Sequence, residues 1–151
     1  MLDIYTDGGC SGNPGPGGWA YVMVQKTAGN DVVAAEGRGG ERNTTNNRME
    51  LRAVISALAF LKTNADLPRQ ATVHTDSQYV QKGISEWIVK WKKDAWRTSD
   101  KKPVKNQDLW MELDSLAALF SPDWRWVKGH DGNEFNEMCY TMTREAIAGI
   151  R

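Results

Sequence analysis

The sequence predicts a single α/β domain, residues 1–151, built around a mixed β-sheet. Strand-like runs come first, and shorter strand patterns then alternate with helical ones. The hydrophobic content of 40% and the charged content of 25% are typical of a globular protein. A chain of 151 residues is long enough to bury a core without disulfides.

The first part of the chain predicts an antiparallel meander. Alternating apolar residues indicate strands at Leu2–Asp7, Trp19–Thr27 and Asp31–Arg38. A loop rich in Gly and Pro separates the first two strands, and Ala28-Gly29-Asn30 separates the last two. Breaks of this kind join neighbouring antiparallel strands.

The rest of the chain alternates helices with two further strands. The polar segment GGERNTTNN offers Thr and Asn caps to a helix with apolar residues at helical spacing, namely Leu51, Val54, Ile55, Leu58 and Leu61. Ala71–Asp76 is a short strand that ends in aspartate. SQYVQKG and SEWIVKWKK predict two short helices, and PVKNQDLWMELDSLAALF predicts a longer one. WRWVK is a final strand, GHDGN a loop, and Glu134–Ile147 a closing helix.

Charge is unevenly distributed along a chain whose formal net charge is zero. Between Lys82 and Lys105 there are eight basic and three acidic residues, so this segment carries +5 and the rest of the chain −5. The zero balance argues against a non-specific nucleic-acid-binding protein. The asymmetry instead predicts a cationic docking surface separate from an anionic region.

The sequence is typical of a cytoplasmic protein. It shows no signal-peptide pattern, and no apolar run approaches the roughly 18 residues that a membrane-spanning helix needs. Cys10 and Cys139 are therefore expected to be reduced thiols rather than a disulfide.

Two of the predicted strands end in a carboxylate. If these strands are adjacent and parallel, Asp7 and Asp76 lie side by side at the carboxyl-end rim, where open α/β sheets build their sites. Glu50 is one position from the apolar side of the first helix, so it can face the same rim. An alternative stays open, because an aspartate at a strand end is often only a turn or cap residue.

Converging carboxylates repel one another strongly unless a cation joins them. A hard divalent cation is the natural partner, either Mg²⁺ or Mn²⁺ as its substitute, because such ions take oxygen ligands. The sequence has no group of Cys and His residues at zinc spacing, which argues against zinc.

Five segments resemble those of a known family. They are YTDGGCSGNPGPGGWA, TTNNRMELRAV, HTDSQYV, GISEWIVKWKKDAWRTSDKKPVKNQDLW and WVKGHDGNEFNEMC. In this order, across nearly the whole chain, they resemble bacterial type 1 ribonuclease H. TDG alone is a weak signal, but the ordered set is very specific. The resemblance implies a ribonuclease H-like fold, with a five-stranded mixed sheet flanked by helices and a basic helical protrusion.

The resemblance also implies an activity: metal-dependent, endonucleolytic hydrolysis of the RNA strand of RNA–DNA hybrids, giving 5′-phosphate and 3′-hydroxyl ends. Asp7, Glu50 and Asp76 match the family's metal-binding carboxylates. His130 matches a loop histidine associated with proton transfer or product release. A metal-activated water is the expected nucleophile, so no nucleophilic side chain is needed. The expected form is a monomer.

One position departs from the family pattern. The family has a fourth aspartate directly after the cysteine of its last motif, whereas NEMCYTM has Tyr140 there. A phenol is neutral at pH 7 and a poor Mg²⁺ ligand, so catalysis with two metal ions is not implied for this chain. Glu137, one helical turn earlier, is a candidate substitute ligand.

Recognition of a hybrid requires contact with ribose 2′-hydroxyls in a wide minor groove. The small residues of Gly8–Gly18 leave room for the backbone to approach this groove. The resemblance assigns Asn13, Asn46, Asn47 and Gln78 to groove contacts, Thr45 to a DNA phosphate, and Trp87 to a DNA sugar. Lys92 and Lys93 are among the lysines expected to neutralise phosphates. The tryptophans of the basic segment also fit the commoner role of packing residues.

Two classes of function follow from the sequence. The first is an enzyme that cleaves the RNA of hybrids, and the second is a hybrid-binding protein whose catalysis is weakened or abolished by Tyr140. A third interpretation is a recombinase of related fold that cleaves plain DNA duplex. The basic segment and TTNNRMEL argue against it.

Overall fold

The structure is a computed structural model that describes residues 1–127 and 133–150. One five-stranded sheet has the order β3-β2-β1-β4-β5. Its strands are β1 (Leu2–Cys10), β2 (Gly15–Thr27), β3 (Asn30–Thr44), β4 (Ala71–Thr75) and β5 (Asp123–Trp126). β1, β2 and β3 form the predicted antiparallel meander, and β4 pairs in parallel with both β1 and β5. The predicted five-stranded mixed sheet is confirmed.

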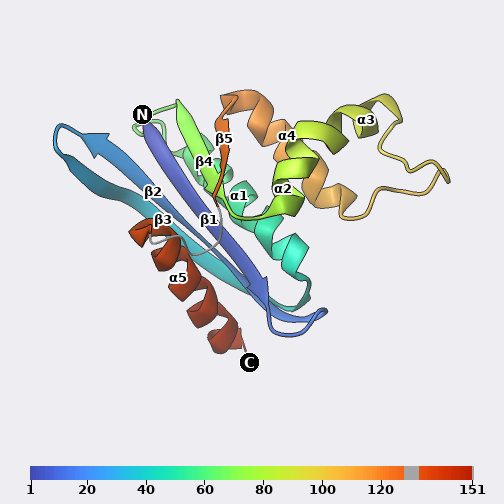
Figure 1. Ribbon diagram of the computed structural model, residues 1–151, viewed down its shortest axis with the longest axis horizontal. Coiled ribbons are helices and arrows are strands. Elements are labelled where there is room, and N and C mark those ends of the chain that lie inside the picture. Colours follow the sequence, from blue (N-terminus) through green and yellow to red (C-terminus); the bar gives the residue numbers. More distant parts are fainter. Residues whose placement is uncertain (128–132, 151) are drawn as a thin grey trace.

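Helices cover both faces of this sheet, as Figure 1 shows. The helices are α1 (Asn46–Thr63), α2 (Gln78–Lys82), α3 (Ile88–Lys93), α4 (Gln107–Phe120) and α5 (Glu134–Ile150). α5 lies on one face, α1 lies on the other, and α4 packs against α1. α3 and the loop after it extend away from the sheet (Figure 1). None of the described helices is both long and apolar enough to span a bilayer.

The alternation of side chains along β1 divides the core into two layers. Leu2 and Ile4 are fully buried and belong to the larger cluster, which fills the space between the sheet, α1 and α4. Tyr5 points to the opposite face and packs with Phe135 and Cys139 of α5. The rim at the carboxyl end of β1 therefore lies between two packed helical layers.

All three strands of the meander are longer than predicted, with β3 reaching Thr44 instead of Arg38, and the loop between β1 and β2 is shorter. β1 continues through Gly8 and Gly9 to Cys10, which pairs with Gly17 on β2. Residues 15–18 thus belong to a strand, and the expected long loop shrinks to residues 11–14. Pairing here depends on backbone groups alone, so an apolar side-chain pattern is not required and the sequence gives no strand signal.

The two short helices predicted after β4 are joined in the structure. α2 runs directly into a π-helical turn, η1 (Gly83–Trp87), and then into α3. Gly83 makes this path available, because a Cβ atom there would collide with the ring of Trp110. The close approach of Gly83 to Trp110 on another helix leaves no local pattern in the sequence. For this reason the sequence predicts two separate helices rather than one continuous segment.

Candidate active site

Parallel pairing of β1 and β4 brings two carboxylates to one rim of the sheet. Tyr5 lies opposite His74 in the register of these strands. Asp7 is two residues beyond Tyr5, and Asp76 is two residues beyond His74. Because side chains alternate with a period of two, Asp7 and Asp76 leave the sheet on the same side at its carboxyl end.

The third carboxylate comes from the second turn of α1. This helix begins after Thr45, whose side-chain oxygen accepts a hydrogen bond from the Arg48 backbone N–H at 3.3 Å. β1 passes very close to the helix here, since a Cβ on Gly8 would collide with the backbone of Met49 and Glu50. Only glycine permits this approach, and it delivers Glu50 to the strand rim.

The three acids form one cluster. An oxygen atom from each of Asp7, Glu50 and Asp76 lies within 4.8 Å of the other two. Glu50 is buried, with 7% of its surface exposed, whereas both aspartates are half-buried. The predicted convergence of these carboxylates is confirmed.

The electrostatics of the cluster are unfavourable without a cation. Burial raises the pKa of Glu50 well above its usual value, and the charges of Asp7 and Asp76 raise this pKa further. Hydrogen bonds from the Gly8 backbone and the Ser77 side chain act in the opposite direction. Three carboxylates whose negative charges repel one another are a set of ligands that fits a hard divalent cation.

Neighbouring elements hold the backbone at the two aspartates. The Thr143 hydroxyl of α5 donates to the carbonyl of Asp7 at 3.4 Å. The indole N–H of Trp126, the last residue of β5, donates to the carbonyl of Asp76 at 3.3 Å. The positions of these carboxylates thus depend on the helix on one face and on the edge strand.

A hollow of about 210 Å³ adjoins the cluster on the side of α5. Its lining residues are Asp7, Gly8, Gly9, Cys10, Asn46, Tyr140, Thr143, Arg144 and Ile147. The Tyr140 side chain is 39% exposed and therefore reaches the solvent beside Asp7. Tyr140, the position at which the sequence analysis expects a departure from the family pattern, thus borders the carboxylate cluster.

Glu137 does not belong to this arrangement. It is exposed and lines a different hollow, which lies between α5 and β3 and also contains Glu36 and Arg38. The three-residue step from Glu137 to Tyr140 leaves an offset of about 60° around the helix axis. Within residues 1–127 and 133–150, the carboxylate cluster comprises Asp7, Glu50 and Asp76, without Glu137.

Comparison with known proteins decides the family. The profile of the RNase H family matches residues 1–148. The chain belongs to the ribonuclease H family. A ribonuclease H of Treponema denticola is 56% identical, with 96% of each chain covered. One of Phenylobacterium zucineum is 53% identical, with 96% of this chain and 89% of the relative covered.

A solved structure gives the same result for the fold. LC9-RNase H1, described as a type 1 RNase H with the type 2 active-site motif, superimposes with a TM-score of 0.87 and is 30% identical. The superposition covers 99% of this chain and 73% of that one. The ribonuclease H family therefore accounts for the whole described sheet and for the helices on both of its faces.

In this ribonuclease H chain, the first polar loop is tied to the start of α1. The side-chain oxygen of Asn13 accepts a hydrogen bond from the backbone N–H of Asn46 at 3.1 Å. Asn46 is exposed and Asn47 is half-buried, both in the first turn of α1. Gln78 is exposed at the first position of α2, directly beyond Asp76 and Ser77. These predicted groove-contacting residues therefore surround the carboxylate rim.

Thr45, predicted to bind a DNA phosphate, caps α1 next to Asn46, whereas Trp87 and the phosphate-binding lysines lie on the basic protrusion formed by residues 87–105. Trp87 is half-buried, and its ring centroid lies 5.9 Å from that of Trp91. Lys92 and Lys93 are exposed at the end of α3. The Lys92 ammonium lies 3.4 Å from an oxygen of Asp114 on α4, so this lysine also connects the protrusion to the body of the protein.

Of the two histidines, only His74 lies within the described residues. His130 lies outside the described residues, and its role stays a prediction. His74 is 14% exposed at its side chain, and its Nε2 atom is 2.9 Å from an oxygen of Asp3. The ring also stacks on Tyr5 with a centroid distance of 4.5 Å. These contacts support a structural role for His74.

The sequence analysis missed two residues that shape the cluster. Ser77 caps α2 by accepting a hydrogen bond from the Val80 backbone at 3.1 Å, and its side chain also bonds Glu50. A serine directly before a helix is a visible cap signal, but its second partner on α1 is not visible in the sequence. Arg144 was missed because nothing in the sequence places it beside Tyr140 and Asp7.

Proposed function

We propose that this protein is an endonuclease that hydrolyses the RNA strand of RNA–DNA hybrids, leaving 5′-phosphate and 3′-hydroxyl ends. The observation that carries the proposal is the meeting of Asp7, Glu50 and Asp76 within 4.8 Å in a chain of the ribonuclease H family. The hydrolase class follows from that family. The assignment of individual catalytic residues is our proposal.

Asp7, Glu50 and Asp76 are the residues that would hold the metal ion, with Mg²⁺ as the proposed cofactor and Mn²⁺ as a substitute. When bound, such an ion stabilises charge on a phosphoryl oxygen and lowers the pKa of a coordinated water. Glu50 is oriented by hydrogen bonds from the Gly8 backbone and the Ser77 side chain. The half-buried aspartates present their carboxylates at the rim, where a phosphate can approach them. His130 is proposed to assist proton transfer or product release.

The proposed substrate contacts form two groups, one close to the carboxylate cluster and one on the basic protrusion. The first group has polar side chains suited to ribose and base edges in the minor groove, namely Asn13, Asn46, Asn47 and Gln78. Thr45 is proposed to bind a DNA phosphate while its hydroxyl caps α1. On the basic protrusion, Lys92 and Lys93 supply positive charge for phosphates, and Trp87 is proposed to contact a DNA sugar.

We further propose that residues 1–151 form one domain that acts as a monomer in the cytoplasm. One sheet runs through the described chain, and its strands come from both halves of the sequence. Both cysteines are free thiols, which fits a reducing compartment.

Tyr140 favours a second candidate function, hybrid binding with weakened or absent cleavage. Its phenol ring lines the hollow beside Asp7, at the position where the resemblance implies an aspartate in the family. A bulky group at this place would leave less room for a second metal ion, whereas the proposed groove contacts and the basic protrusion do not include Tyr140.

The deciding experiment is a gel assay with RNA–DNA hybrids labelled on either strand. The proposed activity requires cleavage of the RNA strand alone, in Mg²⁺ or Mn²⁺, and loss of cleavage in excess chelator. Tight binding without cleavage in either metal would establish the second candidate. Cleavage of a plain DNA duplex would contradict both candidates and indicate a recombinase-like nuclease.

A further inference from the structure

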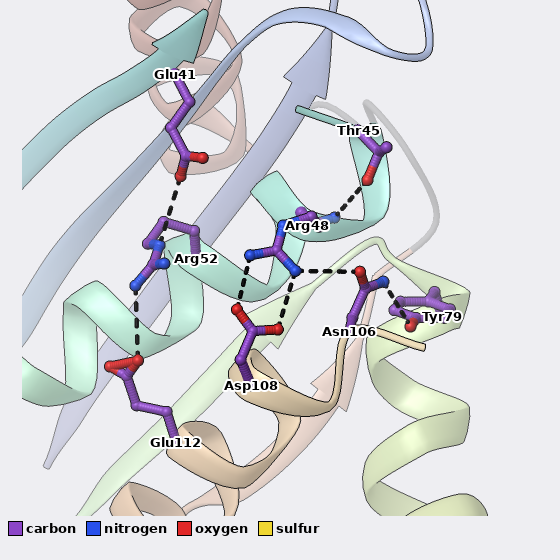
Figure 2. A network of polar contacts seen from close by, with 8 residues as sticks. All are labelled: Glu41, Thr45, Arg48, Arg52, Tyr79, Asn106, Asp108 and Glu112. Carbon is purple, nitrogen blue, oxygen red and sulfur yellow. Dashed lines mark hydrogen bonds and ion pairs between the residues drawn. The ribbon is translucent and has the colours of Figure 1, made fainter. Parts of the chain in front are cut away.

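A network of polar contacts joins the first turn of α1 to the start of α4. The Arg48 guanidinium donates two hydrogen bonds to Asp108, one to each carboxylate oxygen, at 3.0 and 2.8 Å. The same guanidinium donates to the side-chain oxygen of Asn106 at 3.2 Å. Figure 2 shows these groups together, with Arg48 between the two helices. The arrangement fixes both the distance and the angle between its partners, because the Arg–carboxylate contact is bidentate.

The network continues from α4 into α2. The Asn106 side-chain amide donates to the Tyr79 hydroxyl at 3.0 Å (Figure 2). The indole N–H of Trp110, which is fully buried, donates to the same hydroxyl at 2.9 Å. Asn106 has a left-handed backbone with φ of 60°, a conformation that asparagine adopts more readily than most residues. A turn of α1 is therefore linked through Asn106 to the beginning of the helical segment that leads into the protrusion.

The elements that the network joins carry the two proposed substrate-binding regions. α1 begins beside Thr45 and delivers Glu50 to the carboxylate cluster. Asn106 directly follows residues 87–105, the basic protrusion, and Tyr79 lies before it. The network is thus located where the protrusion leaves and rejoins the body of the protein.

Stability alone is a weak explanation for the ion pair in this network. The side chain of Asp108 is 65% exposed and that of Arg48 is 27% exposed. Exposed ion pairs contribute little to the free energy of folding. Asp108 also places a negative charge three residues after the basic protrusion, whose lysines are proposed to bind phosphates. Electrostatics alone disfavours an acid close to such a region. What the pair supplies is a fixed orientation between α1 and the base of the protrusion.

We propose that Arg48 and Asp108 are positioning residues, which hold the basic protrusion at the spacing from the carboxylate cluster that a hybrid duplex requires. This inference rests on the proposed function. It assigns neither residue a contact with the reacting phosphate. Their effect is on the alignment of two binding regions that must engage one duplex at the same time.

A matched pair of variants separates positioning from charge. Asp108→Asn and Glu112→Gln each remove one negative charge from α4. Glu112 also pairs with α1, through Arg52 at 3.6 Å, one helical turn further along α1 than Arg48 (Figure 2). Asp108→Asn is expected to raise KM for a long hybrid by about fivefold or more with kcat within about twofold. Glu112→Gln is expected to leave KM unchanged or to lower it, since it removes an acid without disturbing the first turn of α1.

Two further variants keep the inference testable even if Asp108→Asn does not fold. Arg48→Lys retains the positive charge but loses the two-pronged contact, so it is expected to raise KM as Asp108→Asn does. Asp108→Glu keeps the carboxylate and is expected to recover part of the lost affinity. Thermal unfolding of every variant shows whether a change in KM arises from a folded protein.

Equal KM values for Asp108→Asn and Glu112→Gln, or a lower KM in Asp108→Asn, would overturn the positioning role. Failure of the proposed function gives a different result, because the unmodified chain would then cleave no hybrid in Mg²⁺ or Mn²⁺. In that case hybrid dissociation constants, measured in chelator, replace KM. The same order of the variants is expected in that measurement.

Discussion

The guanidinium carbon of Arg144 lies 6.0 Å from the centroid of the Tyr140 ring, one turn along α5. Both residues line the hollow beside Asp7. A cation at this distance from an aromatic face is attracted to it, so the two side chains stabilise one another's positions. The border of the carboxylate cluster is therefore a neutral ring and a positive charge.

Replacing this ring by a carboxylate tests the importance of Tyr140. Tyr140→Asp is expected to raise the rate of hybrid cleavage in Mg²⁺ on the order of tenfold or more, because a further carboxylate beside Asp7 adds metal ligands and removes a bulky side chain. The measurement is the labelled-hybrid assay with both chains side by side, in Mg²⁺ and in Mn²⁺. Tyr140→Asn is the matched control, since it removes the ring without adding charge. Equal rates for all three chains would show that Tyr140 does not limit catalysis.

Removing one negative charge from the carboxylate cluster is expected to lower activity but to raise stability. Asp7→Asn is expected to lower cleavage in Mg²⁺ by about three orders of magnitude or more, since the metal would lose a charged ligand. Without metal, the same change relieves repulsion of the buried Glu50 and is expected to raise the free energy of unfolding by about 1 kcal/mol. Kinetics and chemical denaturation in chelator measure the two effects. Undiminished turnover in the variant would refute the catalytic assignment of Asp7.

The position of the cluster could be predicted in part, because the direction of each side chain depends on short-range rules. Asp7 and Asp76 each end a strand, and parallel register brings strand ends together at one rim. Glu50 lies in a helix whose apolar spacing reveals which side faces the sheet. Alternation along strands and periodicity along a helix allowed the three carboxylates to meet, but the turn or cap alternative stayed open until the resemblance to the ribonuclease H family favoured a metal site.

Other features depend on partners far away in the sequence, and these were not predicted. The extension of β1 to Cys10 requires pairing with the glycine-rich start of β2. The contact of Arg48 with Asp108 joins helices 60 positions apart. No local pattern indicates which of the two arginines on α1 meets which acid on α4. Local rules indicate the side to which each carboxylate points, whereas the strand pairing and the contacts that support the cluster are long-range.

The close approach of β1 to α1 provides a stability prediction. A methyl group on Gly8 would meet the backbone of Met49 and Glu50, which cannot rotate away. Gly8→Ala is therefore expected to lower the free energy of unfolding by about 2 kcal/mol and to displace Glu50 from the cluster, with loss of cleavage.

Gly149→Ala is the matched control for Gly8→Ala. Its Cβ would have no atom within 4 Å, and Gly149 lies within α5. Alanine is the better helix former, so this variant is expected to be as stable as the parent chain or more stable by up to about 0.5 kcal/mol. Urea denaturation of both variants makes the comparison. Comparable stabilities for the two alanine variants would contradict the proposed steric contact.

The Arg48–Asp108 pair also predicts how stability depends on pH. The hydrogen bonds from Arg48 hold the pKa of the Asp108 carboxyl below its ordinary value of 3.8. A lowered pKa in the folded state means that the stabilising effect of the pair is fully present above the unfolded-state value. That effect is lost as the pH falls through the lower, folded-state pKa. The melting temperature of the parent chain should therefore exceed that of Asp108→Asn at neutral pH, and the difference should shrink below about pH 4.

A second background identifies the source of this pH dependence. In an Arg48→Met chain, Asp108 has lost the donor that lowers its pKa most and keeps only backbone donors, so Asp108→Asn should have a much smaller pH-dependent effect. Thermal unfolding of the four chains between about pH 7 and about pH 3 completes the cycle. A difference that persists undiminished in the Arg48→Met background would mean that another group, such as the helix N-terminus where Asp108 lies, stabilises the carboxylate. A difference that becomes much smaller would assign the effect to the contact that we propose aligns the protrusion with the carboxylate cluster.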